Sequence, residues 1–223
     1  MGRIAAVVFD LDGTLVRYHG IAFESSWGAL AAAAGVGDAS RRLLEEFLGR
    51  PDAYEEWVAR DASLLAGVPV SQVEPLLFPA PYAAGVRRAI ERLRGKYRLG
   101  ILSSGIDLVA EWVREDLELD FAVANHLEIL GGRFTGDSET RVALWSKGEA
   151  LRRLASEHDL DLAEICYVGD HVNDLPAMRI AGLAVAANPK DPQLAEACDH
   201  VIEDFADLPD LIDAFALGQS GLW

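Results

Sequence analysis

The sequence predicts an α/β protein with a doubly wound parallel sheet and a small inserted helical domain. Short apolar runs without polar alternation recur along the chain, which is typical of strands buried on both faces. Helical patterns of about 10–15 residues separate these runs, as expected for βαβ units around a parallel sheet. The chain has 223 residues, 51% of them hydrophobic, which suffices for one ordinary core with a second small lobe.

Four apolar runs are expected to form core strands: residues 3–9, 97–102, 165–168 and 183–186. Helices are expected at 83–95, 107–116, 147–158, 173–181 and 192–197, and this alternation implies right-handed crossovers. Residues 127–135 are expected to form a hairpin that turns at Gly131 and Gly132.

Residues 16–79 break this alternation, because they contain no convincing buried strand. Helical patterns instead occupy about 22–34, 38–48, 52–66 and 71–77. Pro79 and Pro81 close the segment. We therefore expect residues 1–15 and 80–223 to form the α/β core and residues 16–79 to form a helical cap domain.

The composition excludes several classes of protein. Asp and Glu number 36 against 20 Lys and Arg, a net charge of −16, so nucleic acid and anionic membranes are not expected as main partners. No apolar run reaches the roughly 18 residues of a membrane span, and the first strand meets Asp10 too soon for a signal peptide. Cys166 and Cys198 have no paired neighbours, so neither a disulfide framework nor a zinc site is indicated. The expected location is the cytoplasm.

The first expected strand ends in two carboxylates, Asp10 and Asp12. This is the edge at which open α/β sheets bind ligands. Carboxylates there repel each other and lose hydration, so a cation or a shared proton is expected to compensate. Gly13 permits a tight turn, and the Thr14 hydroxyl can bind an anion. The alternative is a solvated Asp-Gly turn that caps a helix.

The second strand ends at Ser103 and Ser104, before a helix that begins near Asp107. Hydroxyl groups and free N–H groups at a helix N-terminus favour anion binding, although either serine could merely cap that helix. Lys147 lies at the start of another helix, where a cation opposes the helix dipole by a few tenths of a kcal/mol. Because the chain has only three lysines, this placement suggests that Lys147 neutralises a phosphate; the alternative is a lysine that faces solvent.

A further strand leads into Asp170, Asn173 and Asp174. The two acids are four residues apart, which is one helical turn. Carboxylates at a strand end suit Mg²⁺, which needs only one or two of them together with water and phosphate. The alternative is an N-capping Asp with an exposed neighbour.

Together the four segments resemble the haloacid dehalogenase (HAD) superfamily of phosphohydrolases, whose four motifs occur in this order. The stretch from Val123 to Met178 is most similar to phosphoserine phosphatases; the matching segments are 124–127, 132–136, 147–149 and 168–178.

This resemblance implies two-step phosphoryl transfer. Asp10 would attack phosphorus and form an aspartyl-phosphate, and Asp12 would act as general acid and then general base with a pKa above the usual value near 4. The phosphoryl oxygens would be held by Gly13, Thr14, Ser103, Ser104, Lys147 and Asn173. Mg²⁺ would be bound by the Asp10 and Asp170 carboxylates and the Asp12 main-chain carbonyl, with Asp174 orienting the site.

The implied substrate is a small phosphorylated metabolite, and the cap departs from the phosphoserine phosphatase pattern. That family carries a Glu nine residues after the nucleophile, where this chain has His19. The family's cap-helix Arg aligns with Asp61; Arg60 is adjacent, but one residue rotates a helical side chain by about 100°. Arg17, Glu24 and Trp57 are further candidates for substrate recognition.

Two other functions remain open at this point. The enzyme could transfer phosphate to an acceptor alcohol such as homoserine, or the protein could be a signalling module that accepts phosphate without hydrolysis. Placement of Asp12 as an acid/base and the inserted cap both favour hydrolysis. Neither a G-x-G-x-x-G nor a G-x-x-x-x-G-K-[ST] motif occurs, which disfavours a dinucleotide-binding module. The oligomeric state is not predicted.

Overall fold

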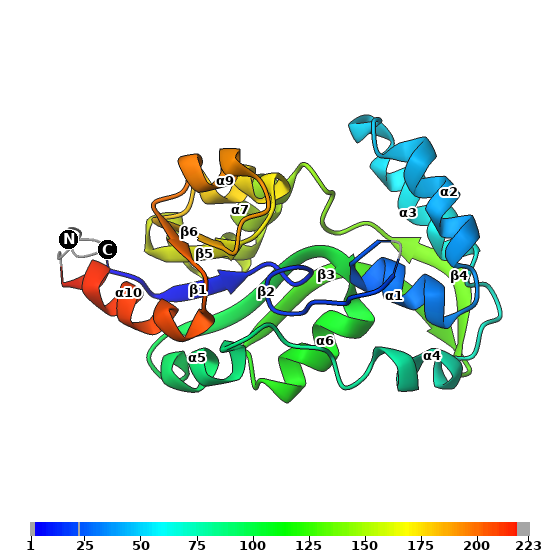
Figure 1. Ribbon diagram of the computed structural model, residues 1–223, viewed down its shortest axis with the longest axis horizontal. Helices are drawn as coiled ribbons and strands as arrows, with labels where there is room; N and C mark the ends of the chain where they lie inside the picture. Colours follow the sequence, from blue (N-terminus) through cyan, green and yellow to red (C-terminus); the bar gives the residue numbers. More distant parts are fainter. Residues whose placement is uncertain (1–2, 22, 218–223) are drawn as a thin grey trace.

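A computed structural model describes residues 3–21 and 23–217, which contain one seven-stranded sheet (Figure 1). The strands are β1 (Ala6–Phe9), β2 (Arg98–Ile106), β3 (Phe121–Leu130), β4 (Arg133–Glu139), β5 (Ile165–Gly169), β6 (Leu183–Ala187) and β7 (His200–Ile202). Their spatial order is β4-β3-β2-β1-β5-β6-β7. Neighbouring strands are parallel except in the antiparallel β3–β4 hairpin. The predicted parallel α/β sheet is confirmed.

Helices cover both faces of the sheet. On one face lie α5 (Val86–Leu93), α6 (Asp107–Asp116) and α10 (Leu208–Ala216), and on the other lie α7 (Lys147–Glu157), α8 (Leu175–Met178) and α9 (Pro192–Ala197). The position of β1 in the sheet explains why apolar and polar residues do not alternate along it. Val7 and Phe9 belong to the first apolar core, whereas Ala6 and Val8 belong to the second, so every side chain of the strand is buried.

The expected strands and the hairpin turn at Gly131 and Gly132 are all present, but some elements differ from the prediction. The helix expected at 173–181 is a 3-10 turn, Val172–Asp174, followed by the short helix α8. The strand β7 and the helix α10 were not predicted. β7 has only three residues, too few for a periodic pattern to be recognised.

Between β1 and the next strand, the chain forms helices α1 (Ser26–Ala33), α2 (Gly37–Phe47), α3 (Tyr54–Ser63) and α4 (Val70–Leu77), with a 3-10 turn at Pro51–Ala53. The four expected helices are present: α1 and α3 are shorter than expected, and the bounds of α2 and α4 lie within one residue of the expected ones. Residue 22, the expected start of the first helix, lies outside the described residues. Helix α1 begins at Ser26 because the Ser25 hydroxyl accepts a hydrogen bond from the Gly28 N–H at 3.1 Å.

The distal end of the β3–β4 hairpin lies with these helices and not with the rest of the sheet (Figure 1). The backbone N–H of Gly67 donates to Phe134 at 2.8 Å, that of Phe134 donates to Val68 at 3.1 Å, and that of Val70 donates to Gly132 at 3.0 Å. Residues far apart in sequence therefore build one lobe together.

Two chain segments connect the helices α1–α4 to the core, and they run side by side. The Arg17 N–H donates to the Pro81 carbonyl at 2.8 Å, and the Ala83 N–H donates to the Leu15 carbonyl at 2.9 Å. Both segments thus pass between the core and the helices α1–α4 at one place, next to the residues that follow β1. None of the helices in the described part of the chain has both the length and the apolar character needed to cross a membrane.

Candidate active site

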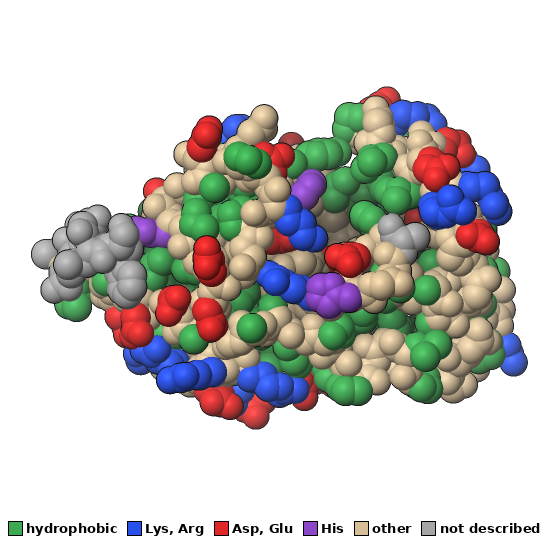
Figure 2. Space-filling model, in the orientation of Figure 1, with side chains coloured by type: hydrophobic (Ala, Val, Ile, Leu, Met, Phe, Trp, Pro, Cys, Tyr) green, Lys and Arg blue, Asp and Glu red, His purple; other side chains and the backbone are tan. Residues whose placement is uncertain are grey.

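The sequence motifs meet at one edge of the sheet because β1 lies between β2 and β5. Asp10 directly follows β1, Ser103 lies near the end of β2, and Asp170 directly follows β5. They line a cavity of about 830 Å³ whose other walls include residues of α1, α2 and α3. Figure 2 shows this hollow in the face of the molecule. Among the predicted site residues, those in its wall are Asp10, Asp12, Glu24, Trp57, Ser103, Ser104, Lys147, Asp170 and Asn173.

Lys147 is buried at the floor of this cavity, with 1% of its surface exposed. Its Nζ lies 2.9 Å from Asp10 Oδ1 and 2.6 Å from Asp174 Oδ1. Burial opposes the charged ammonium, but the two carboxylates prevail and raise the pKa of Lys147 above its ordinary value. Burial likewise raises the pKa of Asp10, and Lys147 limits that rise. The alternative of a lysine facing solvent is wrong.

Gly13 and Thr14 position Asp170 across the site. The Thr14 hydroxyl is buried and donates to Asp170 Oδ1 at 3.2 Å. Gly13 has φ +85°, and a Cβ there would lie 2.3 Å from Asp170 Oδ2. A glycine is therefore required both by the left-handed turn and by the approach of the carboxylate.

The carboxylates of Asp10, Asp170 and Asp174 each present an oxygen within 4.8 Å of the others. Burial, followed by repulsion from Asp10 and Asp174, raises the pKa of Asp170 to about 7. These three carboxylates face two ammonium groups, the buried one of Lys147 and that of Lys190 near Asp170, so negative charge is in excess at the centre. Buried oxygen ligands with such an excess fit a hard divalent cation.

Asp174 differs from the other two acids because its oxygens are already occupied. Lys147 and the Tyr167 hydroxyl, at 3.0 Å, donate to Oδ1, and the main-chain N–H groups of Asp170 and His171, both at 3.1 Å, donate to Oδ2. Asp174 consequently holds Lys147 and the Asp170 loop in place, which agrees with an orienting function.

The Asp12 carboxylate points toward the start of helix α1, in the helical segment formed by α1–α4. Both of its carboxylate oxygens accept hydrogen bonds from Ser26, one from the backbone N–H at 2.7 Å and one from the hydroxyl at 2.6 Å. Burial raises the pKa of Asp12 to about 7, and the Ser26 hydrogen bonds limit the rise. Sequence reasoning missed Ser26; the available signal was that it begins a helix, where free N–H groups bind anions.

The two serines after Leu102 do not cap the following helix, so that alternative is wrong. The N-cap of α6 is Ile106, which makes no side-chain hydrogen bond there. Ser103 Oγ instead accepts from the Gly105 N–H at 3.1 Å. The main-chain carbonyl of Ser104 accepts from three side chains that sequence reasoning did not connect to it: Trp27 at 3.1 Å, Tyr54 at 3.0 Å and Asn125 at 2.8 Å.

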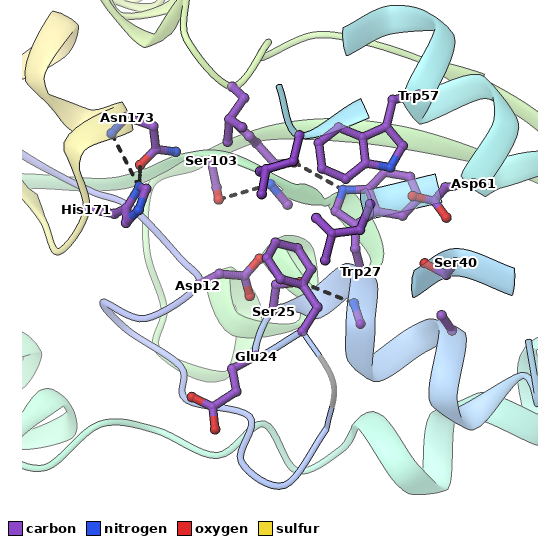
Figure 3. A pocket seen from close by; sticks show the side chains of 18 of the residues that line it. Asp12, Glu24, Ser25, Trp27, Ser40, Trp57, Asp61, Ser103, His171 and Asn173 are labelled. Atoms are coloured by element: carbon purple, nitrogen blue, oxygen red, sulfur yellow. Dashed lines mark hydrogen bonds between the residues drawn. The ribbon is translucent and has the colours of Figure 1, made fainter. Parts of the chain in front are cut away.

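Asn173 and Ser103 both lie in the cavity wall (Figure 3). Its Oδ1 lies 3.1 Å from His171 Nδ1, and the His171 ring also lines the cavity. The structure therefore adds His171 to the residues that a ligand in this cavity would meet.

Of the candidates for substrate recognition, Trp57 and Glu24 lie in the cavity wall, whereas Arg17, His19 and Arg60 are not among the described residues that line it. Arg17 donates to the Gly13 carbonyl at 3.2 Å. His19 is exposed and lies 3.5 Å from Glu24. Arg60 forms an ion pair with Glu46 at 2.6 Å.

Comparisons with known proteins agree with this geometry. The family described as haloacid dehalogenase-like hydrolase matches residues 7–179. The chain is 31% identical to "Phosphoserine phosphatase" of Methanocaldococcus jannaschii, over 88% of this chain and 91% of that protein. It is 27% identical to "Phosphoserine phosphatase" of Lactococcus lactis, over 90% of this chain and 91% of that protein.

Among solved structures, a phospho-aspartyl intermediate analogue of phosphoserine phosphatase superposes with a TM-score of 0.75 and 29% identity, over 94% of this chain and 99% of that one. The similarity thus extends over nearly the whole of both chains and includes the helical segment. It confirms the resemblance found in the sequence. This chain belongs to the haloacid dehalogenase-like hydrolase family and is similar to the phosphoserine phosphatases within it.

Proposed function

We propose that the protein hydrolyses small phosphomonoesters through an aspartyl-phosphate formed on Asp10. The observation that carries this proposal is the pairing of Asp10 with Lys147, at 2.9 Å, at the floor of a cavity large enough for a small metabolite. A carboxylate nucleophile repels an anionic phosphoryl group, and a buried ammonium group beside it offsets that repulsion. The phosphoserine phosphatases to which the chain is similar support the same class of reaction.

In the first step, an Asp10 carboxylate oxygen bonds to phosphorus while the bond to the ester oxygen breaks. Asp12 protonates the departing alkoxide. In the second step, Asp12 accepts a proton from water, whose oxygen attacks phosphorus and releases phosphate and free Asp10. Ser103 and Lys147 bind the phosphoryl oxygens, with Asn173 next to them.

A metal site fits these residues, because Asp10 and Asp170 present buried oxygens close together and carry unbalanced negative charge. We propose Mg²⁺ as the ion, held by the two carboxylates and by the main-chain carbonyl of Asp12. When bound, the ion would neutralise charge on the transferring phosphoryl group.

We further propose that residues 16–79 act as a cap over the core formed by residues 1–15 and 80–223. The cavity lies between α1–α3 and the sheet edge, and the two connections lie side by side at Leu15–Arg17 and Pro81–Ala83. Closing such a cap excludes bulk water while the phosphoenzyme forms.

The test is phosphate release from a panel of phosphorylated metabolites, phosphoserine included, in the presence of Mg²⁺. Wild type should release phosphate, and Asp10→Asn should not, although its side chain has nearly the same shape. Adding an acceptor alcohol such as homoserine separates hydrolysis from transfer, because transfer lowers the yield of free phosphate. A stable phosphoprotein after acyl-phosphate treatment, without turnover, would contradict the proposal and favour a signalling module.

A further inference from the structure

The cavity has two chemically different ends. The end at the sheet edge carries Asp10, Lys147 and the other groups assigned to the phosphoryl group. The end formed by the helical segment is aromatic: Trp27, Tyr54 and Trp57 line it. Tyr54 and Trp57 are 8% exposed, and their ring centroids lie 5.9 Å apart in an edge-to-face arrangement.

One carboxylate interrupts this aromatic wall. Asp61 lies four residues after Trp57 on α3, so the two side chains share a helix face. Asp61 is 9% exposed and lines the cavity together with Ser40 of α2. Figure 3 shows its carboxylate beside Trp57 and facing Ser40, on the opposite side of the view from Asp12 and Asn173. Asp61 forms no ion pair within residues 3–21 and 23–217.

The cationic side chains that line the cavity are already close to other acids. Lys147 is bound to Asp10 and Asp174, and Lys190 lies next to Asp170. Arg41 is half exposed and is paired on its own helix with Asp38 at 3.2 Å and Glu45 at 3.4 Å.

A substrate carboxylate at this end would therefore meet a buried acid, and like charges in a desolvated site exclude a ligand. An ammonium group would instead pair with that acid and lie against aromatic ring faces, which attract cations. Glu24 and Asp38 also line the cavity on its helical side. Glu24 adds charge of the same sign, whereas Asp38 is paired with Arg41.

We propose that the leaving alcohol of the substrate carries an ammonium group and no carboxylate, and that Asp61 with Trp27, Tyr54 and Trp57 binds it. The substrate class is then a phosphorylated amino alcohol, with the ammonium group primary or alkylated. This inference rests on the proposed phosphatase function, and it separates this chain from enzymes whose substrate is an amino acid phosphate.

The test compares esters that differ only in charge. Phosphoethanolamine is paired with propyl phosphate, and phosphocholine with 3,3-dimethylbutyl phosphate, in which carbon replaces the nitrogen. Wild type should favour the cationic member of at least one pair by about tenfold or more in kcat/KM, as expected for a desolvated cation–π and ion-pair site. Asp61→Asn should abolish this preference by lowering kcat/KM for the cationic member of the pair about tenfold or more.

Glu46→Gln is the matched control. It removes the same charge from the neighbouring helix α2, at a position where Glu46 is exposed and bound to Arg60, and it should retain the preference. The comparison of ester pairs on wild type needs no variant. It therefore tests the preference for a cationic leaving alcohol even where Asp61→Asn folds poorly.

Equal turnover of cationic and neutral esters by wild type would overturn the inference. So would a preference for phosphoserine that Arg41→Gln removes, because Arg41 would then bind a substrate carboxylate. Either result still includes Asp10-dependent phosphate release and leaves the proposed phosphatase function intact. Absence of phosphate release from every ester, in contrast, would show that the proposed function itself has failed.

Discussion

Ser26, the first residue of α1, binds both oxygens of the Asp12 carboxylate. Its backbone N–H lies 2.7 Å from Oδ1 and its hydroxyl 2.6 Å from Oδ2. The same hydroxyl oxygen accepts a hydrogen bond from the Ile106 N–H at 3.2 Å, at the end of β2. The helical segment therefore contacts the proposed acid/base directly and orients it between the sheet edge and the cavity.

Replacing Ser26 with Ala should slow the reaction and shift its pH dependence. The hydroxyl favours the ionised form of Asp12, so its loss raises the pKa of Asp12 and moves the acidic limb of the kcat profile to higher pH. We expect kcat to fall roughly tenfold or more, since a hydrogen bond to a charged group contributes about 1.5–3 kcal/mol. Ser63→Ala, which removes an exposed hydroxyl bonded to Arg60, is the control; an unchanged Ser26→Ala profile contradicts the assignment.

Gly13→Ala should displace Asp170 and abolish activity. The added Cβ would lie 2.3 Å from Asp170 Oδ2, in a backbone conformation that L-residues rarely adopt. Gly20→Ala is a matched control, because Gly20 also has a positive φ, +78°, but has no atom within 4 Å of the added Cβ. Steady-state kinetics and thermal unfolding of both variants separate the contact from the backbone strain: similar losses in both would show that strain alone is responsible.

Mg²⁺ should stabilise the folded protein, and Asp170→Asn should remove most of that effect. A ligand that binds only the native state stabilises it by about 2.7 kcal/mol at 100 times its Kd. Thermal unfolding with and without Mg²⁺, after treatment with a chelator, measures this directly and needs no substrate. Asp137→Asn serves as control because Asp137 is an exposed acid on β4. An equal Mg²⁺ effect in Asp170→Asn would place the ion elsewhere.

Asp61→Asn should make the protein more stable at neutral pH. Burial raises the pKa of Asp61 to about 6, while the neighbouring Ser40 and Trp57 limit the rise. Because the folded state binds the proton more tightly than the unfolded state, Asp61 lowers the stability as pH rises from about 4 to 6, and the full penalty applies above pH 6.

We therefore expect Asp61→Asn to raise the free energy of unfolding by about 1–3 kcal/mol at pH 8, a range set by the size of the pKa shift. The gain should shrink toward pH 4, where the wild-type carboxyl is protonated in the folded state and about half protonated in the unfolded state. Urea unfolding at the two pH values measures the difference. A loss of stability at pH 8 would show that the carboxylate is stabilising where it lies.

Much of this protein can be predicted from local sequence. Runs such as residues 6–9 are apolar at every position because both faces of β1 are buried, and such runs identify strands without knowledge of their partners. Asp10 and Asp170 follow strands directly, so their place at the ligand-binding edge follows from strand direction alone. Lys147 could also be identified as a candidate site residue, because the chain has only three lysines and this one lies at the start of a helix.

Other features depend on contacts that no local pattern encodes. Ser26 reaches Asp12 only because α1 begins beside the sheet edge, and the hairpin end at Gly132 joins α4 only through backbone pairing across 62 residues, from Val70 to Gly132. The sequence shows Asp61 only as a departure from the phosphoserine phosphatase pattern. The fold buries it beside aromatic rings, whereas Arg60, one residue earlier, pairs with Glu46. Local periodicity identified most of the elements, and residue type at the strand ends identified the candidate site residues. The packing of helix faces against the sheet edge decided which side chains meet in the cavity, because burial and charge pairing depend on neighbours distant in sequence.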